Sequence, residues 1–416
     1  MKSAGLAHRA AERAARQSYG KLVAYLAART GDVTAAEDAL SDAFAAALAS
    51  WPTRGVPQAP EAWLLTAARR RMIDTARRRR VREAASDRLL LSVEEAAEGM
   101  SSEDVPDWRL RLMFACAHPA IDAAMRGPLI LQTVLGLDAA AIAAAFLTAP
   151  GAMSQRLVRA KRRIHDTGIP FRLPDRADLP ARLDAVLEAI YAAFGAGWPG
   201  GFDARRQGLV EEALWLGHVV VGLLPEEPEG LGLLALMLYS GARRDARRSA
   251  NGEYVPLSEQ DPDLWDAPAI DEAERLLKRA SSHARIGRFQ LEAAVQSVHA
   301  ARRISGRTDW NAILELYDGL LELTGSPVVA VNRAVALSKT AGPQAGLAAL
   351  EELATNPRLV AYQPYWAARA DLLARLGRSA IASAAYARAI LLEPDTSVRH
   401  FLERRARAFG RISPGI

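Results

Sequence analysis

Apolar residues recur along the chain mainly three and four positions apart, the spacing that an α-helix places on one face. Alanine, a strong helix former, is abundant in these stretches. We find no convincing run of alternating β-branched residues, so we predict an all-α protein. Proline-rich breaks and losses of the pattern predict four parts: a helical block over 1–81, a linker over 82–107, a second block over 108–170 and a helical extension over 171–416.

A repeat is recognisable near the end of the extension. Seven positions match the spacing of a tetratricopeptide unit: Trp366, Ala370, Gly377, Ala382, Tyr386, Ala389 and Pro394. Ala334 begins a looser copy 36 residues before Ala370, and a helix pair over about 290–302 and 309–323 fits the same rhythm. Such an array buries a shared core and leaves a concave surface. A purely structural helical bundle is the alternative.

One predicted helix, over 33–51, has an apolar face and an acidic face. Its apolar side chains at positions 33, 36, 40, 43, 44, 47 and 51 lie on one side, which we predict is buried. The opposite side carries Asp38, Asp42, Ala45 and Ala49. Two carboxylates beside alanines form an acidic surface of low relief, which suits a partner helix with basic side chains. An ordinary solvated face is the alternative.

The next predicted helix, over about 59–80, combines an aromatic ring with arginines. Trp63, Arg70 and Arg77 are spaced by seven residues and point away from the apolar stripe, and a run of four arginines ends at Arg80. Arginine neutralises phosphate and a ring stacks on a base, so this face can hold single-stranded DNA. The alternatives are that Trp63 belongs to the core and that the arginines only cap the helix.

Residues 138–164 predict a helix-turn-helix. The first helix spans 138–146 and the second 151–164, where Met153, Leu157, Ala160 and Ile164 share one packing stripe. Residues 151–163 include five basic residues and no acidic one. A recognition helix has this layout, with short polar side chains for base edges and arginines for phosphates. The predicted DNA-contacting residues are Gly151, Ser154, Gln155, Arg156, Arg159, Arg162 and Arg163.

Charge is unevenly distributed along the chain. Residues 1–180 hold 26 Lys and Arg against 20 Asp and Glu, a net charge of +6, whereas the other 236 residues hold 27 against 28, a net charge of −1. The basic excess indicates a polyanionic partner for the N-terminal part. Within the extension, Arg243, Arg244, Arg247 and Arg248 form a basic cluster that we interpret as a regulatory contact for an acidic surface; a solvated loop is the alternative.

Other sequence features argue against several classes of protein. A single cysteine, Cys116, allows no disulfide within the chain. The longest apolar segments, 219–224 and 231–239, are shorter than the roughly 20 residues that span a bilayer. We therefore expect a cytoplasmic protein with no membrane partner. The glycines of 195–200 lack a preceding strand and the seven histidines are scattered, so we predict no catalytic residues, no metal and no cofactor.

Three stretches in this order resemble the extracytoplasmic-function sigma factors of the sigma-70 family. AEDALSDAFAAAL (36–48) resembles their core-polymerase-binding helix, PEAWLLTAARRRMIDTARRRR (60–80) their −10 element helix, and GLDAAAIAAAFLTAPGAMSQRLVRAKRRI (136–164) their −35 helix-turn-helix. The extension resembles a subgroup with tetratricopeptide-like repeats, through RRDARRSANGEYVPLSEQD (243–261) and TDWNAILELYDGL (308–320).

The resemblance implies a transcription factor that performs no covalent chemistry. The Asp38 and Asp42 face would dock on the β′ clamp of core RNA polymerase, the β flap would be a second contact, and the two helical blocks would bind the −10 and −35 promoter elements. The acidic linker, with Glu94, Glu95 and Glu98, would thread into the polymerase channels or contact the arginine cluster of the extension. The extension would regulate activity in place of a separate anti-sigma protein.

Two other functions compete with this hypothesis. One is a DNA-binding transcriptional regulator with a repeat-domain sensor, and the other is a repeat scaffold whose N-terminal part only packs. Neither needs both an acidic docking helix and a second DNA-contacting block. The sequence does not give the promoter bases, the inducing signal, the oligomeric state, or whether the extension activates or inhibits.

Overall fold

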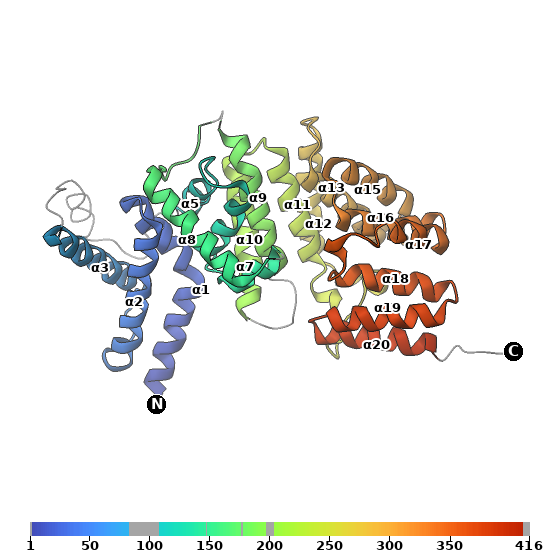
Figure 1. Ribbon diagram of the computed structural model, residues 1–416, viewed down its shortest axis with the longest axis horizontal. Coiled ribbons are helices and arrows are strands. Elements are labelled where there is room, and N and C mark those ends of the chain that lie inside the picture. The colour runs from blue at the N-terminus through green and yellow to red at the C-terminus, as the bar shows by residue number, and fades with distance from the viewer. Residues whose placement is uncertain (1, 83–107, 147, 176–177, 197–203, 411–416) are drawn as a thin grey trace. The chain divides into compact units, whose positions relative to one another are not determined.

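The computed structural model describes residues 2–82, 108–146, 148–175, 178–196 and 204–410 (Figure 1). Within these ranges the regular secondary structure is helical, apart from one isolated β-bridge between Arg248 and Tyr254. The predicted all-α class is confirmed. None of the described helices is long and apolar enough to cross a membrane. The chain forms two compact units, the first reaching Leu216 and the second containing the residues from Gly217 onward.

The first unit is built from two groups of helices. Its elements are α1 (Lys2–Thr30), α2 (Val33–Arg54), α3 (Pro60–Arg82), α5 (Arg109–Cys116), α6 (Ala123–Thr133), α7 (Ala139–Ala145), α8 (Pro150–Thr167), α9 (Leu179–Ala196) and the first part of α10 (Ala204–Leu223). Helices α1 to α3 pack on one another, and α5, α7, α8 and α9 surround α6. The two groups meet where α1 contacts α5 and α6 and where α2 contacts α8.

Helix α2 shows how local sequence sets an element. Asp32 caps its N-terminus, because the Asp32 carboxylate accepts a hydrogen bond of 3.0 Å from the Ala35 amide. The predicted helix ends at Trp51, but α2 continues through Pro52 to Arg54. Proline keeps a helical φ and removes only one hydrogen bond, so the helix can run on for a few residues. It stops at Gly55, whose φ of +85° favours glycine.

Glycine is required where α1 approaches α6. A Cβ atom on Gly20 would lie 1.8 Å from the carbonyl oxygen of Val134, which follows α6 directly. No larger residue fits without moving one backbone away from the other. Gly20 therefore permits the close contact between the two helical groups of the first unit.

The second unit is a succession of antiparallel helices. It contains the end of α10, then α11 (Pro228–Ala242), α12 (Ala267–Ser281), α13 (Arg288–Ala300), α14 (Arg302–Ser305), α15 (Trp310–Thr324), α16 (Pro327–Thr340), α17 (Pro343–Glu351), α18 (Gln363–Arg375), α19 (Ser379–Leu392) and α20 (Thr396–Gly410), with short 3-10 turns η2 (Asp245–Arg247), η3 (Leu257–Glu259), η4 (Pro262–Leu264) and η5 (Pro357–Leu359). Helix α11 is buried along most of its length between α12 and α13.

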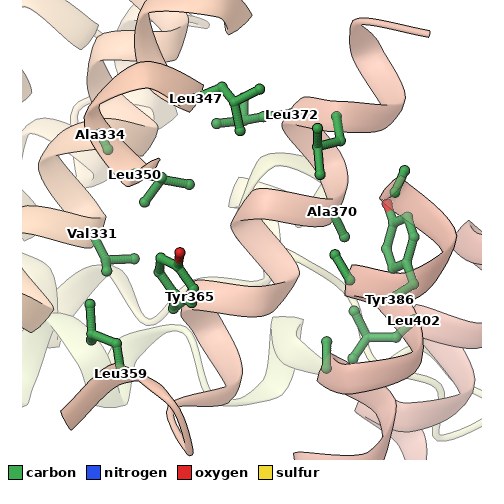
Figure 2. Packing of buried hydrophobic residues seen from close by; sticks show 14 residues of the cluster. Val331, Ala334, Leu347, Leu350, Leu359, Tyr365, Ala370, Leu372, Tyr386 and Leu402 are labelled. Atoms are coloured by element: carbon green, nitrogen blue, oxygen red, sulfur yellow. The ribbon is translucent and has the colours of Figure 1, made fainter. Parts of the chain in front are cut away.

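The last helices share one hydrophobic core, shown in Figure 2. Ala334 on α16, Ala370 on α18, and Tyr386 and Ala389 on α19 are all buried in this cluster, together with leucines of α17, α18 and α20. The alanines among them let neighbouring helices approach closely. Consecutive helices pack on one another, and Gly377, with a φ of +71°, allows the turn between α18 and α19.

Candidate functional site

The acidic residues of α2 lie on its solvent-facing side. Asp38, Asp42, Ala45 and Ala49 are all exposed. The opposite side of the helix is buried as predicted, with Trp51 only 2% exposed, although Phe44 is half-buried. This face therefore presents two carboxylates on a surface otherwise made of small side chains.

Asp42 has a weak partner within the first unit. The Nε atom of Arg71 on α3 lies 3.8 Å from Oδ2 of Asp42, and both side chains are more than half exposed. An ion pair between exposed side chains contributes about 0–1 kcal/mol, because water screens it. A macromolecular partner with its own cations could displace Arg71 at little cost.

Helix α3 separates its arginines into a buried and an exposed set. Arg70 is exposed, whereas the neighbouring Arg69 is buried, donates a hydrogen bond to the Tyr25 hydroxyl and lies 4.9 Å above the Tyr25 ring. The run Arg69–Arg71 does not by itself distinguish these positions. The side chains of Arg77 and Arg80 lie outside the described residues.

Trp63 packs against the core and is also partly exposed to solvent. Its ring packs edge-to-face against the buried Trp51, with centroids 5.5 Å apart and an interplanar angle of 68°. The side chain is nevertheless half-buried, so part of it reaches solvent near the loop between α2 and α3. This packing fixes the ring orientation and leaves part of the side chain accessible.

Helices α7 and α8 occupy the positions predicted for a helix-turn-helix. Met153, Leu157, Ala160 and Ile164 are buried, with relative exposures of 0–8%, which confirms the predicted packing stripe of α8. The predicted DNA-contacting residues all lie on the exposed side: Gly151, Ser154, Gln155, Arg156, Arg159, Arg162 and Arg163. The first turn begins with Pro150 and carries no side chain longer than proline before Met153. Side chains that could reach a base edge therefore begin with Ser154 and Gln155.

Helix α8 is held against α2 by an ion pair that the sequence did not single out. The Lys161 Nζ atom lies 2.7 Å from Oε2 of Glu37, and each side chain is only 12% exposed. Burial raises the pKa of Glu37, and the hydrogen bond and charge from Lys161 oppose that shift. At the end of α8, His165 lies 3.9 Å from Asp32. Lys161 therefore joins the two helical groups, although its position in a basic helix suggests a phosphate contact.

The arginine cluster of the extension lies mainly against its own unit. Arg248 forms an ion pair of 2.8 Å with Asp395 at the start of α20, and Arg243 donates a hydrogen bond to Gln296 on α13. Arg247 is half-buried and Arg244 is exposed. The acidic residues proposed as partners, at 94, 95 and 98, lie outside the described residues.

Comparisons with known proteins assign the class of the first helical block. Residues 15–82 match the family model "Sigma-70 region 2", which supports a sigma-70 family sigma factor. In that family, region 2 is the part that contacts core RNA polymerase and the −10 promoter DNA. Residues 182–281 match "Family of unknown function (DUF6596)".

The chain belongs to the same family as "Uncharacterized protein R00370" of Rhizobium meliloti (strain 1021). The two are 40% identical over 388 residues, which cover 92% of this chain and 90% of that protein. No solved structure matches the chain. The relationship covers both compact units, so the helical extension is shared with a relative of similar length.

Proposed function

We propose that the protein is a sigma subunit of the extracytoplasmic-function type, which binds core RNA polymerase and directs transcription initiation from specific promoters. The observation that carries this proposal is the match of residues 15–82 to sigma-70 region 2, together with exposed Asp38 and Asp42 on the helix of that region expected to bind the polymerase. On this proposal the protein acts in the cytoplasm, as a binding subunit rather than an enzyme.

Each surface has a distinct role in the proposed mechanism. The acidic face of α2 docks on basic residues of the β′ clamp. Arg70 of α3 contacts the phosphates of the melted −10 strand, and Trp63 provides a ring beside the bases. Gln155 of α8 reads base edges at the −35 element, whereas Arg162 and Arg163 contact phosphates.

The proposed mechanism requires the two helical groups of the first unit to separate. The −10 and −35 elements are 25 base pairs apart by name, or about 85 Å at 3.4 Å per step. Helix α2, with 22 residues, is only about 33 Å long at 1.5 Å per residue, and α8 contacts it through Lys161 and Glu37. Both promoter elements therefore cannot be bound while α8 stays on α2. Docking of α2 on the polymerase would begin the opening.

We assign the second unit a regulatory role. Its charge is nearly balanced and its sequence spacing resembles a tetratricopeptide array, which supports binding to a protein partner or to the first unit. Deleting the chain from about Tyr362 would remove α18 to α20 and expose the core they share with α16 and α17. We expect this deletion to change transcriptional output on promoters of the protein.

Run-off transcription tests the proposed function directly. Purified full-length protein is added to core polymerase with a template taken from upstream of its own gene, and a transcript of defined length is expected only when both are present. Arg70→Ala should reduce permanganate reactivity of −10 thymines while core binding is kept. A protein that binds this DNA but yields no transcript with core polymerase would instead be a conventional DNA-binding regulator.

A further inference from the structure

Positively charged side chains gather inside the second unit at the end of α11. Arg243 follows the last residue of α11, Arg247 ends η2, and Arg302 begins α14. His299 in the last turn of α13 is close enough for the charges of Arg243 and Arg302 to affect its ionisation. Helices α11 and α13 pack against each other, so residues about 60 positions apart in the sequence form one cluster.

Two arginines of this region have partners within the second unit: a carboxylate neutralises Arg248, and carbonyl oxygens accept hydrogen bonds from Arg302. Arg248 pairs with Asp395 at 2.8 Å. Arg302 donates to three backbone carbonyl oxygens of the segment 257–260, at 2.6 to 3.2 Å, and its guanidinium lies 5.1 Å from the centre of the Trp265 ring. These two residues hold the loop between α11 and α12 in place.

Arg243 differs from both of them. Its Nη2 atom donates to the Gln296 side chain, but its Nη1 atom is buried and has no hydrogen-bond partner. In the described part of the chain no carboxylate lies within ion-pair distance of Arg243. Burial, together with the like charges of Arg247 and Arg302, lowers the pKa of Arg243 to about 10. A guanidinium with a buried, unpaired nitrogen and no counter-charge is unfavourable, so this position favours an anion.

The arginines of the cluster act on one another electrostatically. Arg247 and Arg302 lower the pKa of Arg243, and Arg248 lowers that of Arg247, in each case in addition to burial. Burial and the arginines lower the pKa of His299 to about 4, so this ring stays neutral and adds no charge near pH 7. The positive charge at Arg243 therefore favours an anion over a neutral ligand.

We propose that Arg243 and Arg247, with the hydroxyl of Tyr254, bind an anion of the phosphate class, either inorganic phosphate or the phosphate group of a small ester. Planar guanidinium groups match the geometry of phosphate oxygens, and a tyrosine hydroxyl adds a further donor. Arg247 and Tyr254 are partly exposed, so the cluster is open to solvent on their side.

Binding at this place would be transmitted to the last helix. Arg247 and Tyr254 belong to a short hairpin in which the Val255 amide donates to the Arg247 carbonyl oxygen at 2.9 Å. Across this hairpin, Arg248 pairs with Asp395 and the Tyr254 ring packs edge-to-face on Phe401 of α20. The anion would thus stabilise the contact between the loop after α11 and α20. This inference does not depend on the proposed function.

Calorimetric titration of the full-length protein tests the site, with inorganic phosphate and adenosine 5′-monophosphate as probes and chloride at matched ionic strength as the reference. We expect saturable binding, and a rise in the unfolding midpoint of about 5 °C at roughly 100 times the dissociation constant. Arg243→Met should weaken binding at least tenfold, whereas Arg244→Met, at the exposed adjacent position, should leave it unchanged. Tighter binding of inorganic phosphate would identify the free anion as the ligand, and tighter binding of the nucleotide would identify a phosphate ester.

A second variant tests the site independently of any misfolding of Arg243→Met. Arg247→Gln changes a partly exposed side chain and should also weaken phosphate binding while the helical content by circular dichroism is retained. The proposal is wrong if the wild-type protein shows no saturable binding of either probe. It is also wrong if both arginine variants bind as the wild type does.

Discussion

The arginines of the first unit and those of the second unit have different surroundings. Arg70, Arg159 and Arg162 extend into solvent from helices whose other sides are buried. In the second unit Arg243 and Arg302 turn inward, where they contact a side-chain amide, backbone carbonyls and an indole ring. Charge that a unit leaves exposed is available to an external partner, whereas charge that it buries must be neutralised within the fold or by a bound ion. The following predictions test this difference.

The largest effect is expected where the first unit buries a charge of its own. Lys161→Met leaves Glu37 buried without its partner, and breaking a buried ion pair in this way costs about 3–5 kcal/mol. The free energy of unfolding, measured in urea, should fall by this amount. Arg162→Met on the same helix removes only an exposed pair with Asp166 and should cost less than about 1 kcal/mol.

A double variant separates charge from packing at this position. Glu37→Leu combined with Lys161→Met replaces the ion pair by apolar side chains and should recover most of the lost stability. If Lys161→Met and Arg162→Met destabilise the protein equally, the Lys161–Glu37 pair does not hold α8 on α2.

Reversing the charge of the exposed acidic face of α2 should weaken binding to core polymerase and leave the fold intact. Asp38→Arg/Asp42→Arg places like charges against a basic partner, and we expect core polymerase to bind at least about 100-fold more weakly. Co-purification and a titration with labelled core enzyme measure the change. Glu211→Arg, an exposed reversal on α10 of the same unit, serves as the control. Unchanged affinity of the double variant would remove α2 from the docking surface.

Acid should destabilise the second unit through His299. Burial lowers the pKa of folded His299 from 6.5 to about 4, so below pH 6.5 the unfolded chain takes up a proton that the folded chain does not. The stability contributed by neutral His299 is present above pH 6.5 and is lost as the pH falls toward 4. Urea unfolding should show a loss of about 2 kcal/mol between pH 7 and pH 5. His299→Gln should remove that part of the dependence; an unaltered pH profile would contradict the assignment.

The smallest effects are expected on the exposed face of α8. Arg162→Ala should lower the slope of log affinity against log salt by about one, for every DNA sequence alike. Gln155→Ala should instead relax preference at one or two positions of the −35 element, by about 1–3 kcal/mol. Selection from a promoter library distinguishes the two outcomes. Arg358→Ala, an exposed arginine of the second unit, should change neither.

The faces of individual helices were predictable from the sequence, because helical periodicity and burial are local properties. The spacing of apolar residues placed Trp51 and Ile164 in the core and Asp38 and Arg159 at the surface, as the structure has them. The repeat spacing likewise placed Ala370 and Tyr386 in one core. Periodicity placed Arg70 away from the apolar stripe of α3, but it could not show that Arg69 is buried against Tyr25, because that contact joins residues 44 positions apart in the sequence.

The sequence by itself determined the all-α class, the order of the helices, the buried stripes of α2 and α8, and the resemblance of residues 36–48 and 60–80 to the first sigma region. Only the tertiary structure decided that Lys161 pairs with Glu37, 124 residues away, and that the half-buried Arg243 lies near Arg302 with one nitrogen unpaired. The physical reason is that the spacing of charged residues in the sequence is the same whether their side chains face water or another helix. Its role depends on which distant side chain, if any, the fold brings within reach.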